Sequence, residues 1–148
     1  MEPVRLAMVG CGMMGQSVHL RNFLRTDRCS VVAVCDQQPG LAEEVAAAHG
    51  IPQHFDSVDT LLRNCDFDAA AAIVLWPLNL DLSMQLMEAG KHVYIEKPMA
   101  ANSDDAHRMA DCAKANNVKL MVAYMKRYDT GCQKAKQLID EARENGEM

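Results

Sequence analysis

Short runs of apolar residues alternate with amphipathic stretches along the whole chain. Several of these runs are apolar at every position, as expected for strands that are covered on both faces of a parallel sheet. The pattern predicts strands at residues 4–9, 30–35, 52–55, 69–75, 92–96 and 119–123. The first of these runs ends directly at a glycine, which favours a sharp turn at that point.

The stretches between the strands carry apolar residues at i, i+3, i+4 and i+7, which is typical of helices with one buried face. This spacing predicts helices over residues 15–25, 41–48, 58–65, 80–89, 103–113 and 135–142. Ser57 and Ser103 are predicted to cap two of them, and Gly50, Gly90 and Gly146 to end three. The alternation predicts an α/β fold, a doubly wound parallel sheet of about six strands with helices on both faces.

A glycine-rich motif, Gly10-Cys11-Gly12-Met13-Met14-Gly15, lies between the first strand and the first helix, as in dinucleotide-binding Rossmann folds. Gly10 would allow the tight turn, Gly12 the close approach of a pyrophosphate, and Gly15 the packing of helix on strand. The helix N-terminus would offer unpaired N–H groups to the phosphates. We therefore predict that Gly10, Gly12, Met13, Met14 and Gly15 bind the cofactor; a glycine-rich turn without a ligand is the alternative.

Asp36 follows the second strand, about 20 residues beyond the motif, where a carboxylate can accept hydrogen bonds from the ribose hydroxyls. It would also repel a 2′-phosphate, and the following residues 37–39 supply no Lys or Arg to hold one. The cofactor is therefore predicted to be NAD rather than NADP. Two alternatives stay open: Asp36 caps a turn, and Cys11, near a helix N-terminus, is a nucleophile.

Glu96-Lys97-Pro98 follows the fifth predicted strand, and ligands in such sheets bind at the carboxyl ends of strands. The ammonium group of Lys97 could hydrogen-bond a substrate oxygen and stabilise negative charge as a hydride is transferred. The alternative is a surface lysine. Pro98 allows both a cis and a trans peptide bond with Lys97, and the sequence does not choose between them.

The glycine motif, Asp36 and the segment 90–98 together resemble the Gfo/Idh/MocA dehydrogenases, and residues 125–129 resemble a basic-aromatic segment of the same family. The resemblance implies an NAD(P)-dependent oxidoreductase that transfers a hydride to or from a sugar, cyclitol or related polyol. It implies that Lys97 is the catalytic lysine and that Glu96 lies near the nicotinamide ribose. It also implies that Arg127 lines the cofactor or substrate cleft; a solvated charge near a helix start is the alternative.

Residues 76–81 depart from the family pattern Thr-Pro-Asn-x-x-His, of which only Pro77 is kept. Trp76 could stack on the cofactor or simply pack, and we include both Trp76 and Pro77 among the predicted cofactor-binding residues. The resemblance also implies a C-terminal substrate-binding domain, which the 148 residues do not contain. We expect residues 1–148 to form the Rossmann domain alone, to bind NAD with little turnover, and to associate with copies of itself through exposed apolar surface.

Composition narrows the remaining function classes. A formal net charge of -5 disfavours nucleic-acid binding, and no apolar run approaches the roughly 18 residues of a membrane span. The six cysteines form no Cys-x-x-Cys pair, so we expect reduced thiols, a cytoplasmic protein and no metal site. A non-catalytic NAD-binding module or sensor that acts through a partner protein is the alternative function. A Rossmann domain for a methyl donor or a mononucleotide fits the glycine pattern and Asp36 less well.

Overall fold

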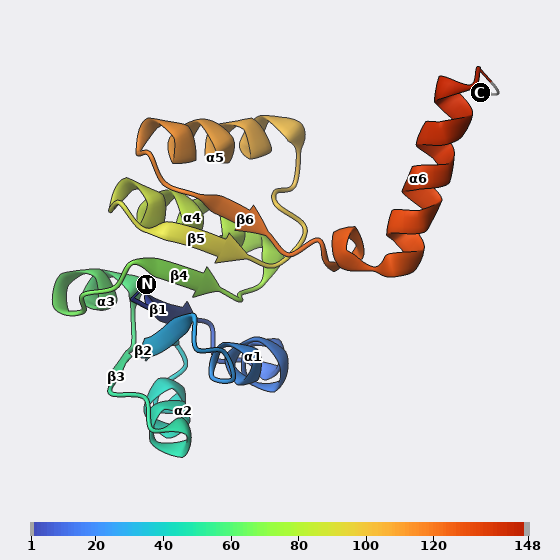
Figure 1. The fold of residues 1–148 in the computed structure, drawn as a ribbon. Coiled ribbons are helices and arrows are strands. Elements are labelled where there is room, and N and C mark those ends of the chain that lie inside the picture. The colour runs from blue at the N-terminus through green and yellow to red at the C-terminus, as the bar shows by residue number, and fades with distance from the viewer. Residues whose placement is uncertain (1, 147–148) are drawn as a thin grey trace.

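The computed structural model describes residues 2–146 and shows a six-stranded parallel sheet with helices packed around it (Figure 1). The strand order is β3-β2-β1-β4-β5-β6. The strands are β1 (Val4–Val9), β2 (Cys29–Cys35), β3 (Gln53–Phe55), β4 (Ala69–Ala72), β5 (His92–Ile95) and β6 (Leu120–Val122). The predicted doubly wound fold is confirmed, while the ends of the predicted domain, residues 1 and 147–148, lie outside the described residues.

The helices follow the strands in alternation. They are α1 (Arg21–Phe23), α2 (Leu41–His49), α3 (Val58–Asn64), α4 (Asn79–Glu88), α5 (Ser103–Ala115) and α6 (Thr130–Glu144). Three further turns complete the chain: a π-helical turn at Gly15–Leu20 and 3-10 turns at Trp76–Leu78 and Met125–Tyr128. Residues 13–23 therefore form one helical segment whose middle is π-helical.

The sheet has two cores because successive side chains of a strand point to opposite faces. Ala7 and Val9 of β1 belong to the core that α3, α4 and α5 cover. Leu6 and Met8 belong to the opposite core, covered by α2 and by the helical segment that begins at the glycine motif. The strand order reverses between β1 and β4, and ligands in such sheets bind beyond the carboxyl ends of the strands at this reversal.

Element boundaries differ from the predicted ones where pairing or capping decides them. β4 ends at Ala72 because Val9, the last residue of β1, pairs with it; the apolar residues that follow form loop and 3-10 turn. The cap of α5 was predicted at Ser103, but Asn102 provides it, accepting a hydrogen bond from the Asp105 N–H at 2.8 Å. The Ser57 cap and the glycine stops after α2, α4 and α6 are confirmed.

The last helix differs from the others because it extends away from the sheet (Figure 1). No residue of α6 is buried, and Leu138 on its apolar stripe is 52% exposed. The sheet face nearby is also open: Met121 of β6 pairs with Tyr94 of β5, so the two share a face, and Met121 is 45% exposed. Within the described residues, this end of the domain carries apolar surface without a packing partner.

Candidate functional site

A cleft of about 880 Å³ lies at the carboxyl ends of the strands, where the order reverses. The loops after β1, β2, β4 and β5 all contribute to its walls. The predicted site residues that line it are Gly10, Gly12, Met13, Met14, Gly15, Asp36, Trp76, Glu96 and Lys97. Pro77 and Arg127 are not among the described residues of the lining, although the neighbouring Met125 is.

The three glycines of the motif have different surroundings. A Cβ atom on Gly10, whose φ is +94°, would lie 2.2 Å from the Ile73 carbonyl oxygen, and one on Gly15 would lie 2.3 Å from the Gly10 carbonyl oxygen. A Cβ on Gly12 would meet nothing within 4 Å. Gly10 and Gly15 are therefore required by the packing of the loop itself, whereas Gly12 leaves open space through which a ligand can approach the backbone.

The loop leads directly into a helix, which begins at Met13. The first N–H groups of a helix have no partner within it and carry partial positive charge. The loop before them is held by Gln16, whose side-chain amide donates to the Cys11 carbonyl at 2.6 Å. The open backbone at Gly12, next to a helix N-terminus, fits the pyrophosphate of a dinucleotide.

Both carboxylate oxygens of Asp36 accept hydrogen bonds from backbone N–H groups, one in the glycine loop and one in the turn after β2. Oδ2 accepts a hydrogen bond from the Cys11 N–H at 2.7 Å, and Oδ1 accepts one from the Gln38 N–H at 2.8 Å. The turn-capping alternative from the sequence is thus a real feature of the structure. It does not exclude the cofactor role, because each carboxylate oxygen can accept a second hydrogen bond.

Cys11 does not have the surroundings of a nucleophile. Its side chain is fully buried in the core beneath the loop. Desolvation by burial, together with the nearby charge of Asp36, raises the pKa of the Cys11 thiol to about 12. Since the thiolate is the reactive form, a thiol that stays protonated at neutral pH argues against this alternative.

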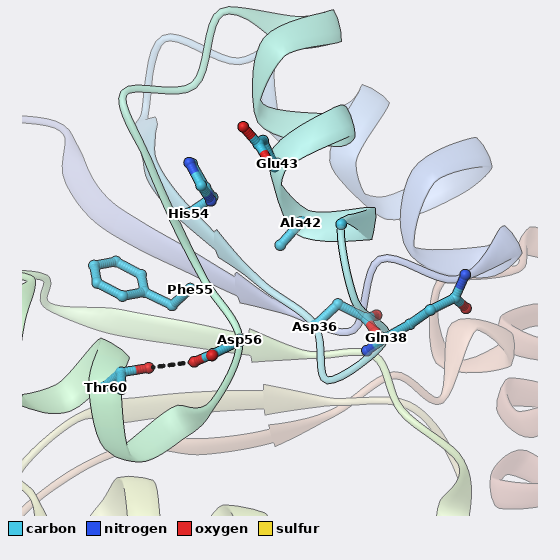
Figure 2. A pocket seen from close by; sticks show the side chains of 9 residues that line it. Asp36, Gln38, Ala42, Glu43, His54, Phe55, Asp56 and Thr60 are labelled. Carbon is cyan, nitrogen blue, oxygen red and sulfur yellow. Dashed lines mark hydrogen bonds between the residues drawn. The ribbon is translucent and has the colours of Figure 1, made fainter.

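A smaller pocket of about 350 Å³ adjoins the cleft between α2 and β3 (Figure 2). Three carboxylates line it, those of Asp36, Glu43 and Asp56, and none of its described lining residues is Lys or Arg. Figure 2 shows Asp56 directed toward Thr60, whose hydroxyl donates to the Asp56 carboxylate at 3.1 Å. Asp36 and Asp56 line both the pocket and the cleft, so the negative charge continues from one to the other.

Lys97 lies just beyond the carboxyl end of β5. Its side chain is exposed and lines the cleft. Its peptide bond with Pro98 is cis. The Lys97 N–H donates to Glu96 Oε2 at 3.0 Å. The other carboxylate oxygen of Glu96 lies 2.8 Å from Nε2 of His19, in the π-helical turn, and a carboxylate can only accept this bond.

Two buried polar residues near Lys97 escaped the sequence analysis. His19 contacts Glu96, and the Asn79 side-chain amide donates to the backbone carbonyls of Glu96 and Pro98 at 3.1 and 2.9 Å. In the sequence, His19 stands four residues before Phe23, so the two side chains are expected on the same face of the predicted helix. This spacing was the one available indication that His19 is buried. For Asn79 the signal was weaker, because it lies in the segment that departs from the family pattern.

The rest of the lining combines polar residues such as Gln37, Ser57 and Gln85 with apolar ones. Trp76 is half-exposed at the mouth of the cleft, and Met13 and Leu75 near it are mostly exposed. Arg127 lies in the 3-10 turn after β6, exposed and outside the lining. None of the helices among residues 2–146 combines the length and the apolar character that a bilayer crossing requires.

Comparison with known proteins gives consistent matches. A family model described as an oxidoreductase family with an NAD-binding Rossmann fold matches residues 4–124. Inositol 2-dehydrogenase 3 of Saccharopolyspora erythraea is 32% identical over 139 residues, which cover 93% of this chain and 40% of that protein. The chain thus spans well under half the length of this relative.

Two solved structures show how far the likeness extends. The WlbA dehydrogenase from Bordetella pertussis, in complex with NADH and UDP-GlcNAcA, superposes with a TM-score of 0.87 at 29% identity, covering 95% of this chain and 43% of that one. A 3-ketoreductase from Actinomadura kijaniata, in complex with TDP-benzene and NADP, has a TM-score of 0.85 at 22% identity, covering 95% and 43%. At that identity the second likeness shows the fold alone.

Proposed function

The chain belongs to the Gfo/Idh/MocA oxidoreductase family, and from this premise we propose that it is the NAD-binding domain of a dehydrogenase for a sugar, cyclitol or related polyol. The observation that carries the proposal is the meeting of Gly12, Asp36 and Lys97 around one cleft. The first two suit a dinucleotide, and the third suits the oxygen of a substrate. The naming of the relative as an inositol dehydrogenase supports this substrate class.

The cofactor we propose is NAD rather than NADP. Asp36 would accept hydrogen bonds from the ribose hydroxyls while keeping its bonds to the loop. A 2′-phosphate there would meet Asp36 and, in the adjoining pocket, the carboxylates of Glu43 and Asp56. Like charges, with no Lys or Arg among the described lining residues of that pocket, disfavour the extra phosphate.

NAD, when bound, supplies the hydride acceptor. Lys97 would hydrogen-bond the reacting hydroxyl and stabilise the negative charge that develops on its oxygen. Glu96 would contact the nicotinamide ribose, and Trp76 would cover part of the cleft and exclude water. For Pro77 and Arg127 the proposed cofactor role rests on the family resemblance alone, since neither is among the described residues of the lining.

We further propose that a C-terminal substrate-binding domain completes the cleft. The relatives are more than twice as long as the region they share with this chain, and α6 presents an apolar stripe with no partner among the described residues. The same exposed surface supports self-association of the domain. A cytoplasmic location is supported by the six free cysteines, of which three are buried.

A non-catalytic NAD-binding module remains the second candidate. The altered segment 76–81 favours it, because the polar Asn and His of the family pattern are missing from their positions. The exposure of Lys97 to the cleft favours catalysis instead. The two candidates agree on NAD binding and differ only on turnover.

Calorimetric titration of the purified chain with NAD, NADH, NADP and NADPH tests the shared part of the proposal. We expect NAD(H) to bind with a clear preference over NADP(H). Absorbance at the NADH band, with a panel of inositols and sugars as substrates, then tests turnover. Binding without turnover supports a cofactor domain that needs a second domain, whereas the absence of any dinucleotide binding would overturn the proposal.

A further inference from the structure

The geometry points to His19 and Asn79 as positioning residues that hold the segment bearing Lys97 in place. This inference rests on the proposed dinucleotide function of the cleft. Neither residue is among those that line the cleft. Both act through Glu96 and its neighbours, and both are buried, His19 at 8% exposure and Asn79 at 0%.

His19 is fixed on several sides. Its Nε2 atom lies 2.8 Å from Glu96 Oε1, and the Tyr94 hydroxyl lies 3.5 Å from Nδ1. The ring stacks on Phe23 at a centroid distance of 6.3 Å and meets the edge of Tyr94 at 5.6 Å. A histidine fixed in this way holds the carboxylate of Glu96 in one position. The second oxygen of that carboxylate accepts a hydrogen bond from the Lys97 N–H.

Asn79 holds the same segment from the other side. Its amide Nδ2 donates to the Glu96 carbonyl and to the Pro98 carbonyl, which flank Lys97 in the chain. Because Asn79 is the first residue of α4, it anchors this segment to a helix packed in the core. The amide is the group that fits here: two carbonyl oxygens need a donor with two hydrogens, which an aspartate lacks.

The two contacts matter because Lys97 itself is exposed and has a long, flexible side chain. The position of its ammonium group therefore depends on where the Lys97 backbone lies. Small displacements of a reacting group reduce reaction rates strongly. His19 lies in the π-helical turn of the helix that begins at the phosphate loop. The His19–Glu96 bond thus joins the phosphate end of the cleft to the end that bears Lys97. Such π-turns are frequently found at functional sites.

Binding of two probes can separate this role from general stability. NADH spans the whole proposed site, whereas ADP lacks both the nicotinamide and its ribose and reaches only the phosphate and adenosine part. We expect His19→Leu and Asn79→Leu to weaken NADH by about tenfold, because Glu96, the proposed contact of the nicotinamide ribose, is then no longer held in place. ADP affinity should stay within about twofold. His19→Gln, which can still donate to Glu96, should restore most of the NADH affinity.

His49→Leu, on the exposed face of α2, is the matched control and should change neither affinity. Equal weakening of NADH and ADP by His19→Leu, or no rescue by His19→Gln, would overturn the inference. If the unmodified chain binds neither probe, the proposed function fails instead, so the two failures are distinguishable.

Hydrogen exchange gives a second test that needs no ligand. The Lys97 N–H is bonded to Glu96, and exchange at this amide should become at least severalfold faster in His19→Leu than in His19→Gln. The comparison remains useful if the leucine variant is less stable, because Asn79→Leu should accelerate the same amide without removing the His19 contact. Unchanged exchange at Lys97 in both leucine variants would contradict the positioning role.

Discussion

Asp36 accepts a hydrogen bond from the backbone N–H of Cys11 at 2.7 Å, and this contact ties the end of β2 to the glycine loop after β1. The carboxylate therefore shapes the loop before any ligand arrives. Its second oxygen holds the Gln38 N–H and fixes the turn that follows β2. The capping role that the sequence offered as one alternative is thus present, and the contact with the ribose hydroxyls is the second role that we propose for this side chain.

Replacement of Asp36 should separate these two roles. Asp36→Ala removes the acceptors for both backbone N–H groups, so we expect it to lower the free energy of unfolding by about 1–3 kcal/mol and to weaken NAD. Asp36→Asn keeps one acceptor and removes the charge, so it should cost less stability while still narrowing the preference for NAD over NADP. Calorimetric titration and thermal unfolding measure both effects, with Asp111→Asn on α5 as the control. A variant still strongly selective for NAD would refute the proposed specificity role.

Alanine at two glycines of the loop should have opposite effects. Gly12→Ala places its methyl group in open space, so the free energy of unfolding should change by less than about 0.5 kcal/mol. Dinucleotide affinity should nevertheless fall by more than about tenfold, because the methyl group prevents the close approach of the pyrophosphate. Gly15→Ala would bring a methyl group to 2.7 Å from the Met8 side chain and 2.3 Å from a backbone oxygen. It should destabilise the fold by about 1–3 kcal/mol. Urea unfolding and calorimetry distinguish the two; equal stability losses would contradict this interpretation.

Trp76 is the only tryptophan of the chain, so the intrinsic tryptophan fluorescence reports on the mouth of the cleft alone. We expect NADH binding to quench this emission and to sensitise the emission of NADH by energy transfer. Trp76→Phe should abolish the signal and reduce affinity by about 0.5–1.5 kcal/mol if the ring stacks on the ligand. Calorimetric binding without any change in fluorescence would show that Trp76 faces away from the ligand.

The sequence was sufficient to predict the strands, because runs such as 30–35 must be buried on both faces and leave little choice of structure. It was also sufficient to predict the sharp glycine loop between β1 and the first helix, where the spacing of the three glycines has a physical reason. It did not predict that β4 stops at Ala72, since the length of a strand depends on its neighbour β1. Nor did it predict the exposure of Leu138, since a stripe of apolar residues does not say what covers it.

Buried polar contacts between distant segments were the least predictable part of the site. His19 and Glu96 are far apart in the chain, and a single sequence contains no record of their contact. Arg127 shows the converse: its residue type suited a cleft, but the 3-10 turn after β6 leaves it outside the lining. Local spacing therefore predicted the backbone of the site, while the contacts among its side chains required the fold.

Stability in acid should depend on Asp68, which directly precedes the central strand β4. Hydrogen bonds from the Arg5 guanidinium lower the pKa of the Asp68 carboxyl from 3.8 to about 2. Because the pKa is lower in the folded state, this stabilisation is complete above about pH 5 and is lost as the pH falls toward 2. Both side chains are about 40% exposed, so solvent screening limits the contribution to about 1 kcal/mol or less.

Asp68→Asn should accordingly lower the free energy of unfolding at pH 7 and have little effect at pH 2. Urea unfolding across this range measures the difference, with Asp111→Asn as the control that should show no such pH dependence. A difference between Asp68→Asn and the unmodified chain that is constant from pH 7 to pH 2 would refute the assignment.

Lys97→Ala tests the chemistry itself, in the protein in which this domain acts together with its proposed substrate-binding domain. General acid–base and electrostatic contributions of one side chain are typically about 100-fold or more in rate, so the rate of the chemical step should fall by at least this factor. NAD affinity should change little, because the glycine loop and Asp36 at the other end of the cleft are untouched. Lys119→Ala, an exposed lysine beside β6, is the matched control. Single-turnover reduction of NAD separates the chemical step from binding, and an unchanged rate in Lys97→Ala would refute the catalytic assignment of Lys97.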